Sequence, residues 1–260
     1  MGNQIRVGVF GAAGRMGRTI CAAVDADPDL DLVAGVDPFA AGEVVAGITV
    51  AKEAHAFADA AVQVAIDFTI VDAARSNAVW CATHAIHAVI GTSGFGDKDI
   101  DDLRHLFSGD GPNCVWAANF AIGAVLEGYL AAKVAPFFDT VEIVESHHDT
   151  KKDAPSSTAV DTARRIASAN DKWAADPTEI ESLPGARGAR GAAGIPIHSM
   201  RMRGMIATQE TVFGTTGQTL SIRHETYDRT SFMPGVLMAT KAVADTPGLT
   251  LGLDALLGLT

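Results

Sequence analysis

Short apolar segments alternate with amphipathic ones along the first 120 residues of the chain. The apolar runs are rich in valine and isoleucine, and the segments between them have helical periodicity. Strands are predicted at 5–10, 30–37 and 62–69, within 87–95 before a glycine-rich exit, and within 114–120 before a turn. Helices are predicted at 15–26, 72–84 and 97–107. Strands that alternate with helices favour a parallel sheet with crossover helices, which is the α/β class.

The pattern changes after Asn119. Helices are predicted at 121–135 and 156–169, with a strand at 140–148 between them. From Ile195 to His224 apolar and polar residues alternate as they do in antiparallel strands. We therefore predict a first domain over 1–120 and a second, α+β domain over 121–233. A last helix at 234–244 is predicted to return the chain, as 234–260, to the first domain.

The segment from Asp176 to Gly194 is rich in glycine, proline and arginine. Such a composition is typical of loops, because glycine and proline interrupt regular structure. We predict a mobile loop here, in which Arg187 and Arg190 are exposed to solvent.

Composition and charge exclude several classes of function. Hydrophobic residues make up 48% of the 260 residues, which is enough for a folded core. The net charge of −11 makes the chain a poor non-specific binder of DNA, RNA or anionic lipid. We therefore expect no nucleic-acid partner and no membrane partner. An anionic substrate would need a local cluster of positive charge.

The three cysteines, Cys21, Cys81 and Cys114, are far apart and lack CxxC spacing. This pattern predicts neither a disulfide framework nor a zinc site, and it fits a reducing compartment. The N-terminal segment lacks a signal-peptide layout, and no apolar run is long enough to cross a membrane. We expect a cytoplasmic protein.

A glycine-rich turn, "GAAGRMG" at 11–17, follows the first predicted strand and opens the first helix. Its glycines permit a tight turn and the close approach of a pyrophosphate to helix N–H groups. Asp37 lies 20 residues after Gly17, at the end of the second strand, where a carboxylate binds ribose hydroxyls. The spacing is G-x-x-G-x-x-G rather than G-x-G-x-x-G, and such turns also occur without a ligand. Strand, helix and Asp37 together favour a dinucleotide-binding domain.

Two more segments follow strands of the same sheet. "GTSGF", at 91–95, resembles a nucleophile elbow around Ser93, but Phe95 stands where G-x-S-x-G requires glycine. A turn that lines a ligand is the better interpretation, because open α/β sheets bind ligands at the carboxyl ends of their strands. "AANF", at 117–120, ends the next strand and is predicted to line the same edge.

The segment "ESHHDTKKDAPSSTA", at 145–159, concentrates positive charge in an acidic chain. Within six residues lie His147, His148, Lys151 and Lys152. Pro155 and Ser156 are typical of a helix start, whose N–H groups attract anions. Such a run can also be a solvated loop, but the helix start directly after it favours a site for an anionic substrate. The spacing differs from HExxH and no cysteine is near, so no metal site is predicted.

At these motifs the chain resembles the dihydrodipicolinate reductase family, also called 4-hydroxy-tetrahydrodipicolinate reductases, of bacterial lysine and diaminopimelate biosynthesis. The likeness covers nearly the whole chain. The segments similar to the family, in family order, are "GAAGRMG", "DFT", "GTSGF", "ANFAIG", "HHDTKKDAPSST", "LPGARG", "GIPIHSMR" and "DRTSFMPGV". The resemblance implies a Rossmann-type cofactor domain and a substrate domain with a mixed sheet that builds a homotetramer. It also implies reduction of a cyclic imine dicarboxylate with NADH or NADPH.

The resemblance also implies roles for individual residues. His147 and Lys151 match the catalytic positions, and His148, Ser157 and Thr158 match contacts to the substrate carboxylates. The cofactor positions are Gly11, Ala12, Ala13, Gly14, Arg15, Met16, Asp37, Gly91, Thr92, Ser93, Ala117, Ala118, Asn119 and Phe120.

Two positions depart from the family pattern. Ser93 replaces a threonine and keeps a hydroxyl, so its effect is expected to be mild. Ser157 replaces a glycine at a point where backbone N–H groups meet a substrate carboxylate, so it bears on substrate affinity.

Two other functions remain open from the sequence. A semialdehyde dehydrogenase needs a nucleophilic cysteine, but Cys114 lies inside a predicted strand with no base beside it. A non-catalytic NAD(P)-binding paralogue would explain Ser157, although the presence of His147 and Lys151 argues against it.

Overall fold

The computed structural model describes residues 4–259 of the chain. The fold consists of two compact units. Unit 1 comprises Met1–Phe120 and Phe232–Thr260, and unit 2 comprises Ala121–Ser231. No helix among the described residues has both the length and the apolar character needed to cross a membrane.

Unit 1 is built on a six-stranded parallel sheet in the order β13-β7-β6-β5-β1-β2. Its central strands are almost wholly buried, as expected for parallel strands covered on both faces. The strand order reverses at β1, beside which a ligand is usually bound in such sheets. The strands are β1 (Ile5–Phe10), β2 (Leu30–Val36), β5 (Val64–Asp67), β6 (His87–Ile90), β7 (Cys114–Trp116) and β13 (Leu249–Leu251).

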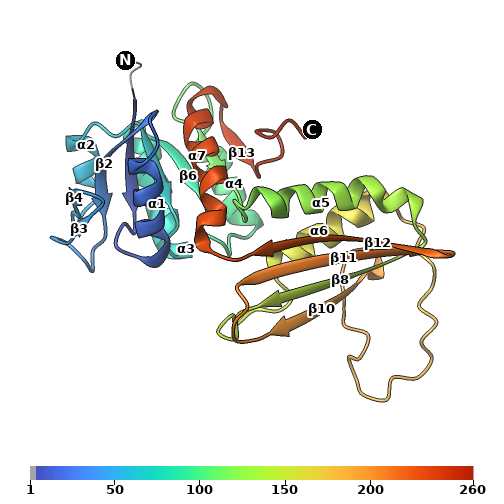
Figure 1. Ribbon diagram of the computed structural model, residues 1–260. Helices are drawn as coiled ribbons and strands as arrows, with labels where there is room; N and C mark the ends of the chain where they lie inside the picture. The colour runs from blue at the N-terminus through green and yellow to red at the C-terminus, as the bar shows by residue number, and fades with distance from the viewer. Residues whose placement is uncertain (1–3, 260) are drawn as a thin grey trace. The chain divides into compact units, whose positions relative to one another are not determined.

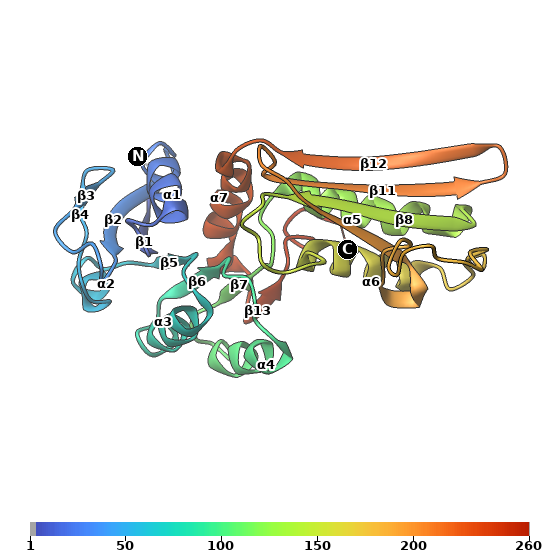
Figure 2. The same ribbon diagram turned by 90° about the horizontal axis from the view of Figure 1, so that it is seen from below.

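Helices cover both faces of this sheet, so the fold is Rossmann-like, as predicted. Helices α1 and α7 pack together on one face, and α3 and α4 on the other (Figure 2). Their bounds are α1 (Arg15–Asp25), α3 (Val71–Thr83), α4 (Asp97–Leu106) and α7 (Met233–Ala242). Smaller elements are β3 (Val44–Val45), β4 (Ile48–Thr49), α2 (His55–Asp59) and η4 (Val243–Asp245). The short helix η3 (Arg229–Phe232) lies where the chain passes from unit 2 to unit 1.

Unit 2 is built on a five-stranded mixed sheet in the order β12-β11-β8-β10-β9. Helices α5 (Ile122–Val134) and α6 (Ser157–Ala169) lie on one face of it (Figure 1). A short helix, η1 (Ala135–Phe137), follows α5. The strands are β8 (Thr140–His147), β9 (Ala189–Arg190), β10 (Pro196–Arg201), β11 (Ala207–Thr215) and β12 (Gln218–Thr226).

The direction of β10 differs from the prediction. Alternation along 195–224 indicated antiparallel strands, and β11 and β12 do form an antiparallel hairpin. However, β10 runs parallel to β8, with Arg201 beside His147. The reason is that α6 lies between β8 and β10 in sequence and acts as a crossover, whereas alternation reports only which face a residue occupies.

The segment 176–194, predicted as a loop, is largely irregular but includes two short elements. It contains β9 and a short helix, η2 (Ala192–Gly194). Arg187 pairs with Glu142 on β8 and with Asp176, and Arg190 also pairs with Asp176. Arg190 is exposed, as predicted, even though it pairs with Asp176. Arg187 is only partly exposed, because Glu142 and Asp176 hold its guanidinium group.

The alternating pattern of β8 determines which face carries the chemistry. Val141 and Ile143 are buried against helix α6 and strand β11 in an apolar core. Successive strand residues point to opposite faces, so Glu145 and His147 continue the same helix-covered face beyond that core. The buried residues of β8 are thus apolar in its first half and polar near its end.

Candidate active site

The glycine turn of unit 1 has the geometry that a dinucleotide requires. Gly11 has a φ of 65°, and a Cβ at Gly17 would lie 2.0 Å from the Gly11 carbonyl oxygen. Neither position accepts a side chain without rearrangement. Gly14 caps α1 without any side-chain hydrogen bond. The N–H groups at the start of α1 therefore point out of the turn without a side-chain cap, as a phosphate site requires.

Asp37 follows β2 directly and is half-buried. Its Oδ1 accepts a hydrogen bond from the Phe39 N–H at 3.1 Å, which fixes the carboxylate at the strand end. Arg15 lies in the turn, and Arg18 directly follows it. Arg18 pairs with Glu43 and donates to the Ala13 carbonyl at 2.9 Å, whereas Arg15 is exposed.

The other two predicted cofactor segments share this edge of the sheet. Residues 91–93 follow β6, and residues 117–120 follow β7, which is the neighbouring strand. The carboxyl ends of parallel strands lie at one edge, so the structure brings all three segments together. Three of the predicted residues are buried in their turns: Thr92, Ala117 and Phe120. Ser93 and Ala118 are exposed, and Gly91 and Asn119 are half-buried.

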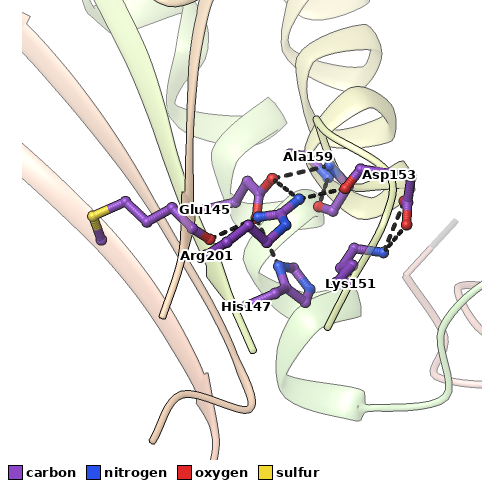
Figure 3. A network of polar contacts seen from close by, with 8 residues as sticks. Glu145, His147, Lys151, Asp153, Ala159 and Arg201 are labelled. Atoms are coloured by element: carbon purple, nitrogen blue, oxygen red, sulfur yellow. Dashed lines mark hydrogen bonds and ion pairs between the residues drawn. The ribbon is translucent and has the colours of Figure 1, made fainter. Parts of the chain in front are cut away.

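In unit 2, Glu145 is the centre of a polar network (Figure 3). Its side chain is 0% exposed, and its Oε2 lies 2.6 Å from His147 Nδ1. A buried carboxylate is an acceptor, so the Nδ1 proton of His147 faces Glu145. The other ring nitrogen, Nε2, is then the one that can meet a ligand.

Arg201 joins β10 and the loop after β8 to the same carboxylate. Its two terminal nitrogens lie 2.9 Å from the two oxygens of Glu145, which is a bidentate pair. One of them also donates to the Asp153 carbonyl at 2.6 Å. Glu145 Oε1 accepts in addition the N–H of Ser156 at 3.1 Å. The carboxylate thus ties two strands to the start of α6.

The hydrogen bonds decide the charge of Glu145. Burial alone would raise the pKa of this carboxyl, but bonds from His147, Arg201 and Ser199 outweigh burial and lower the pKa to about 2. Glu145 is therefore an anion throughout the physiological range and is a strong hydrogen-bond acceptor for His147 Nδ1.

Lys151 and His148 lie in the loop after β8. Lys151 Nζ donates to both carboxylate oxygens of Asp153, at 2.9 and 2.8 Å. His148 Nδ1 lies 2.7 Å from Thr150 Oγ1. His148 is exposed and Lys151 is partly buried, and each is held by a short local contact. A ligand carboxylate is able to replace Asp153 as the partner of Lys151.

The start of α6 has the predicted cap. The Ser156 side chain accepts a hydrogen bond from the Ala159 N–H at 3.2 Å. Ser157 and Thr158 are the first residues of the helix, and Ser157 is exposed. Because the helix dipole is positive at this end, the α6 start and the nearby cations form a site suited to a dicarboxylate.

The sequence motifs identified His147, Lys151 and the helix start, but they assigned no role to Glu145 or Arg201. Glu145 stands two residues before His147, a spacing that places both on one strand face. No sequence spacing relates Arg201 to this group, because only the pairing of β10 with β8 brings it beside His147.

The cysteines and the possible metal ligands are the remaining groups with reactive chemistry. Among residues 4–259, no group of three or more histidine, cysteine, aspartate or glutamate side chains is placed to hold a metal ion. Cys114 is fully buried, and burial raises the pKa of its thiol well above the ordinary value. A buried neutral thiol is a poor nucleophile, which argues against semialdehyde dehydrogenase chemistry.

Comparisons with known proteins extend over the whole chain. Family models described as dihydrodipicolinate reductase, N-terminus and C-terminus, match residues 5–120 and 123–257. The 4-hydroxy-tetrahydrodipicolinate reductase of Mycolicibacterium vanbaalenii is 44% identical over 257 residues, which cover 98% of this chain and 100% of the relative. That of Corynebacterium urealyticum is 44% identical over 261 residues, with the same coverage.

A solved structure agrees with these relatives. The dipicolinate-bound dihydrodipicolinate reductase from Paenisporosarcina sp. TG-14 is 36% identical, with a TM-score of 0.84 over 97% of this chain and 99% of that chain. Both units, with the glycine turn in one and the His147 network in the other, lie within the matched residues. The chain therefore belongs to the dihydrodipicolinate reductase family.

Proposed function

We propose that this chain catalyses the NAD(P)H-dependent reduction of 4-hydroxy-tetrahydrodipicolinate to tetrahydrodipicolinate in lysine and diaminopimelate biosynthesis. The observation that carries the proposal is the network of Glu145, His147 and Arg201, with Lys151 and the α6 start beside it. It combines proton donors with a site for carboxylates. Unit 1 is assigned to the dinucleotide, and unit 2 to the substrate and to assembly.

The nicotinamide cofactor, when bound, supplies the hydride. The residues of unit 2 bind the substrate and supply the proton. The α6 start at Ser157 and Thr158, together with His148, binds the carboxylates. Glu145 keeps the Nδ1 proton of His147, so that His147 Nε2 and Lys151 Nζ are the groups that hold a proton for the substrate. His147 ends β8 and Lys151 lies four residues later in the loop that follows, and the two act as the acid.

The test is a direct assay. NADH or NADPH absorbance is followed at fixed enzyme with freshly made product of the synthase that precedes this step. Steady oxidation that depends on both components supports the proposal. Cofactor binding without turnover would instead favour the non-catalytic paralogue.

We expect NADH to be used at least as well as NADPH, with neither excluded. Asp37 repels a 2′-phosphate and binds a free 2′-hydroxyl, and Glu43 holds Arg18. Asp37→Ala is expected to move the ratio of kcat/KM values toward NADPH by about tenfold. Steady-state kinetics with both cofactors measure this ratio. The role of Asp37 would be contradicted if the parent already preferred NADPH clearly and Asp37→Ala kept that preference.

Ser157→Gly is expected to lower KM for the imine dicarboxylate several-fold, while KM for NADH stays constant. Ser157 is the first residue of α6, and its side chain narrows the approach of a carboxylate to the helix N–H groups. Glycine opens that approach. A higher substrate KM in the glycine variant would show that the Ser157 hydroxyl binds the carboxylate.

We also propose a homotetramer assembled through the sheet of unit 2. Strand β12 is an edge strand of nine residues and is mostly exposed. Long exposed edges and open sheet faces associate with other chains. Light scattering is expected to give the mass of four chains, and a stable monomer at micromolar concentration would refute this assembly.

A further inference from the structure

The segment Asp67-Phe68-Thr69 lies where the three predicted cofactor turns of unit 1 meet. Asp67 is the last residue of β5, which stands between β1 and β6. It pairs with Phe10 on one side and with Ile90 on the other. The glycine turn begins directly after Phe10, and the turn at 91–93 directly after Ile90.

The Asp67 carboxylate joins two of these strand ends and a helix. It is only 3% exposed. Its Oδ1 accepts the N–H of Thr69 at 2.8 Å, the Thr69 hydroxyl at 2.6 Å and the Thr92 hydroxyl at 3.3 Å. Its Oδ2 accepts from Asn77 Nδ2 on α3 at 2.7 Å. All four of these donors belong to the protein, and the carboxylate is buried, so it acts on the surrounding segments and not on solvent.

Phe68 and Thr69, the next two residues, contact the predicted cofactor turns. A Cβ at Gly11 would lie 3.0 Å from Thr69 Cγ2, and a Cβ at Gly91 would lie 2.1 Å from the Phe68 ring. The Phe68 ring also packs against that of Phe120, with centroids 5.2 Å apart. Thr69 therefore lies against the glycine turn, and Phe68 lies against both other turns.

We infer that Asp67 is a positioning residue for the cofactor site: it fixes Thr69 and Thr92, and through them the turns at 11–17 and 91–93. Asp67 does not itself reach the cofactor. Pre-formed turns bind more tightly, because binding then costs less ordering of the chain. This inference rests on the dinucleotide role proposed for unit 1.

The experiment compares variants by direct titration of NADH fluorescence. Asp67→Ala removes every acceptor and is expected to raise the NADH Kd about tenfold, the loss expected from roughly one charge-assisted hydrogen bond. Asp67→Asn is expected to stay within about threefold of the parent. Its amide oxygen still accepts from both threonines, and Asn77 accepts from the new amide group after its own amide turns.

Asn113→Ala is the matched control. Asn113 is also buried, and it also links separate segments, because it donates to the Val243 and Ala244 carbonyls and accepts from the Gly248 N–H. It precedes β7, at the opposite edge of the sheet from the turns. Its loss should destabilise unit 1 with little change in the NADH Kd. Equal Kd changes in Asp67→Ala and Asn113→Ala would overturn the inference.

A second measurement needs no cofactor. Amide hydrogen exchange in the turns at 11–17 and 91–93 is expected to be faster in Asp67→Ala than in Asn113→Ala, and unchanged exchange there would overturn the inference. If Asp67→Ala does not fold, Asn77→Ala gives the same test, because it removes one donor to the Asp67 carboxylate at a residue outside the predicted cofactor positions. A parent protein that binds neither NADH nor NADPH would refute the proposed function instead, and hydrogen exchange would still decide the role of Asp67.

Discussion

His147→Gln is expected to lower kcat by roughly 10²–10⁴-fold, the usual contribution of a positioned general acid. The NADH Kd should stay near that of the parent, because the predicted cofactor residues all belong to unit 1. Glutamine still donates a hydrogen bond but cannot hold and release a proton at neutral pH. The expected signature is therefore a lower kcat with little change in cofactor affinity.

Lys151→Ala is expected to lower kcat over the same range of roughly 10²–10⁴-fold. The ammonium is held by both oxygens of Asp153, which places it next to the Arg201 contact of that loop. Lys152→Ala is the matched control, since Lys152 is the next residue, carries the same charge and is exposed. Steady-state NADH oxidation at saturating substrate measures kcat. If His147→Gln and Lys151→Ala both kept the parent kcat, the assignment of the acid would be wrong.

The parallel sheet of unit 1 was predictable because its strands are buried on both faces and therefore appear as apolar runs. The runs at 5–10 and 62–69 contain β1 and β5, with limits shifted by up to two residues for β5. Three small elements were missed: the β3–β4 hairpin, α2 and β13. They contain two to five residues each, which is too short for a periodic pattern to form.

The segment 145–159 shows which part of a candidate site can be read from sequence. The Pro155-Ser156 pattern predicted a helix start, and Ser156 does cap α6. In contrast, Arg201 and Glu145 are 56 residues apart and meet only because β10 runs parallel to β8. Alternation gives the face of a strand but neither its neighbour nor its direction. For the same reason Glu142 could not be identified as the partner of Arg187.

Glu145→Gln is expected to be the most damaging single change in unit 2. It leaves the Arg201 guanidinium beside a neutral amide in a mostly buried site, where loss of one partner of an ion pair costs about 3 kcal/mol or more. It also removes the anion that fixes the Nδ1 proton of His147, so kcat should fall by about 10²-fold. Urea unfolding and steady-state kinetics measure the two effects separately.

Glu145 also makes the stability of the parent protein depend on pH, and the sign of this dependence follows from the pKa of Glu145. The pKa is about 2 in the folded protein, below the ordinary value of 4.5. Its ionisation therefore stabilises the fold above pH 4.5, and this contribution is lost as the pH falls from 4.5 toward 2. The difference corresponds to roughly 3 kcal/mol.

The parent protein should accordingly lose about 3 kcal/mol more stability than Glu145→Gln between pH 5 and pH 2. Glu210→Gln is the matched control, because Glu210 lies on the neighbouring strand β11 but is partly exposed, with Arg223 as a distant partner at 3.9 Å. It should follow the parent curve. Parallel pH curves for the parent and Glu145→Gln would mean that Glu145 is not held as a buried anion. The bidentate pair with Arg201 would then not be what joins β8, β10 and the start of α6.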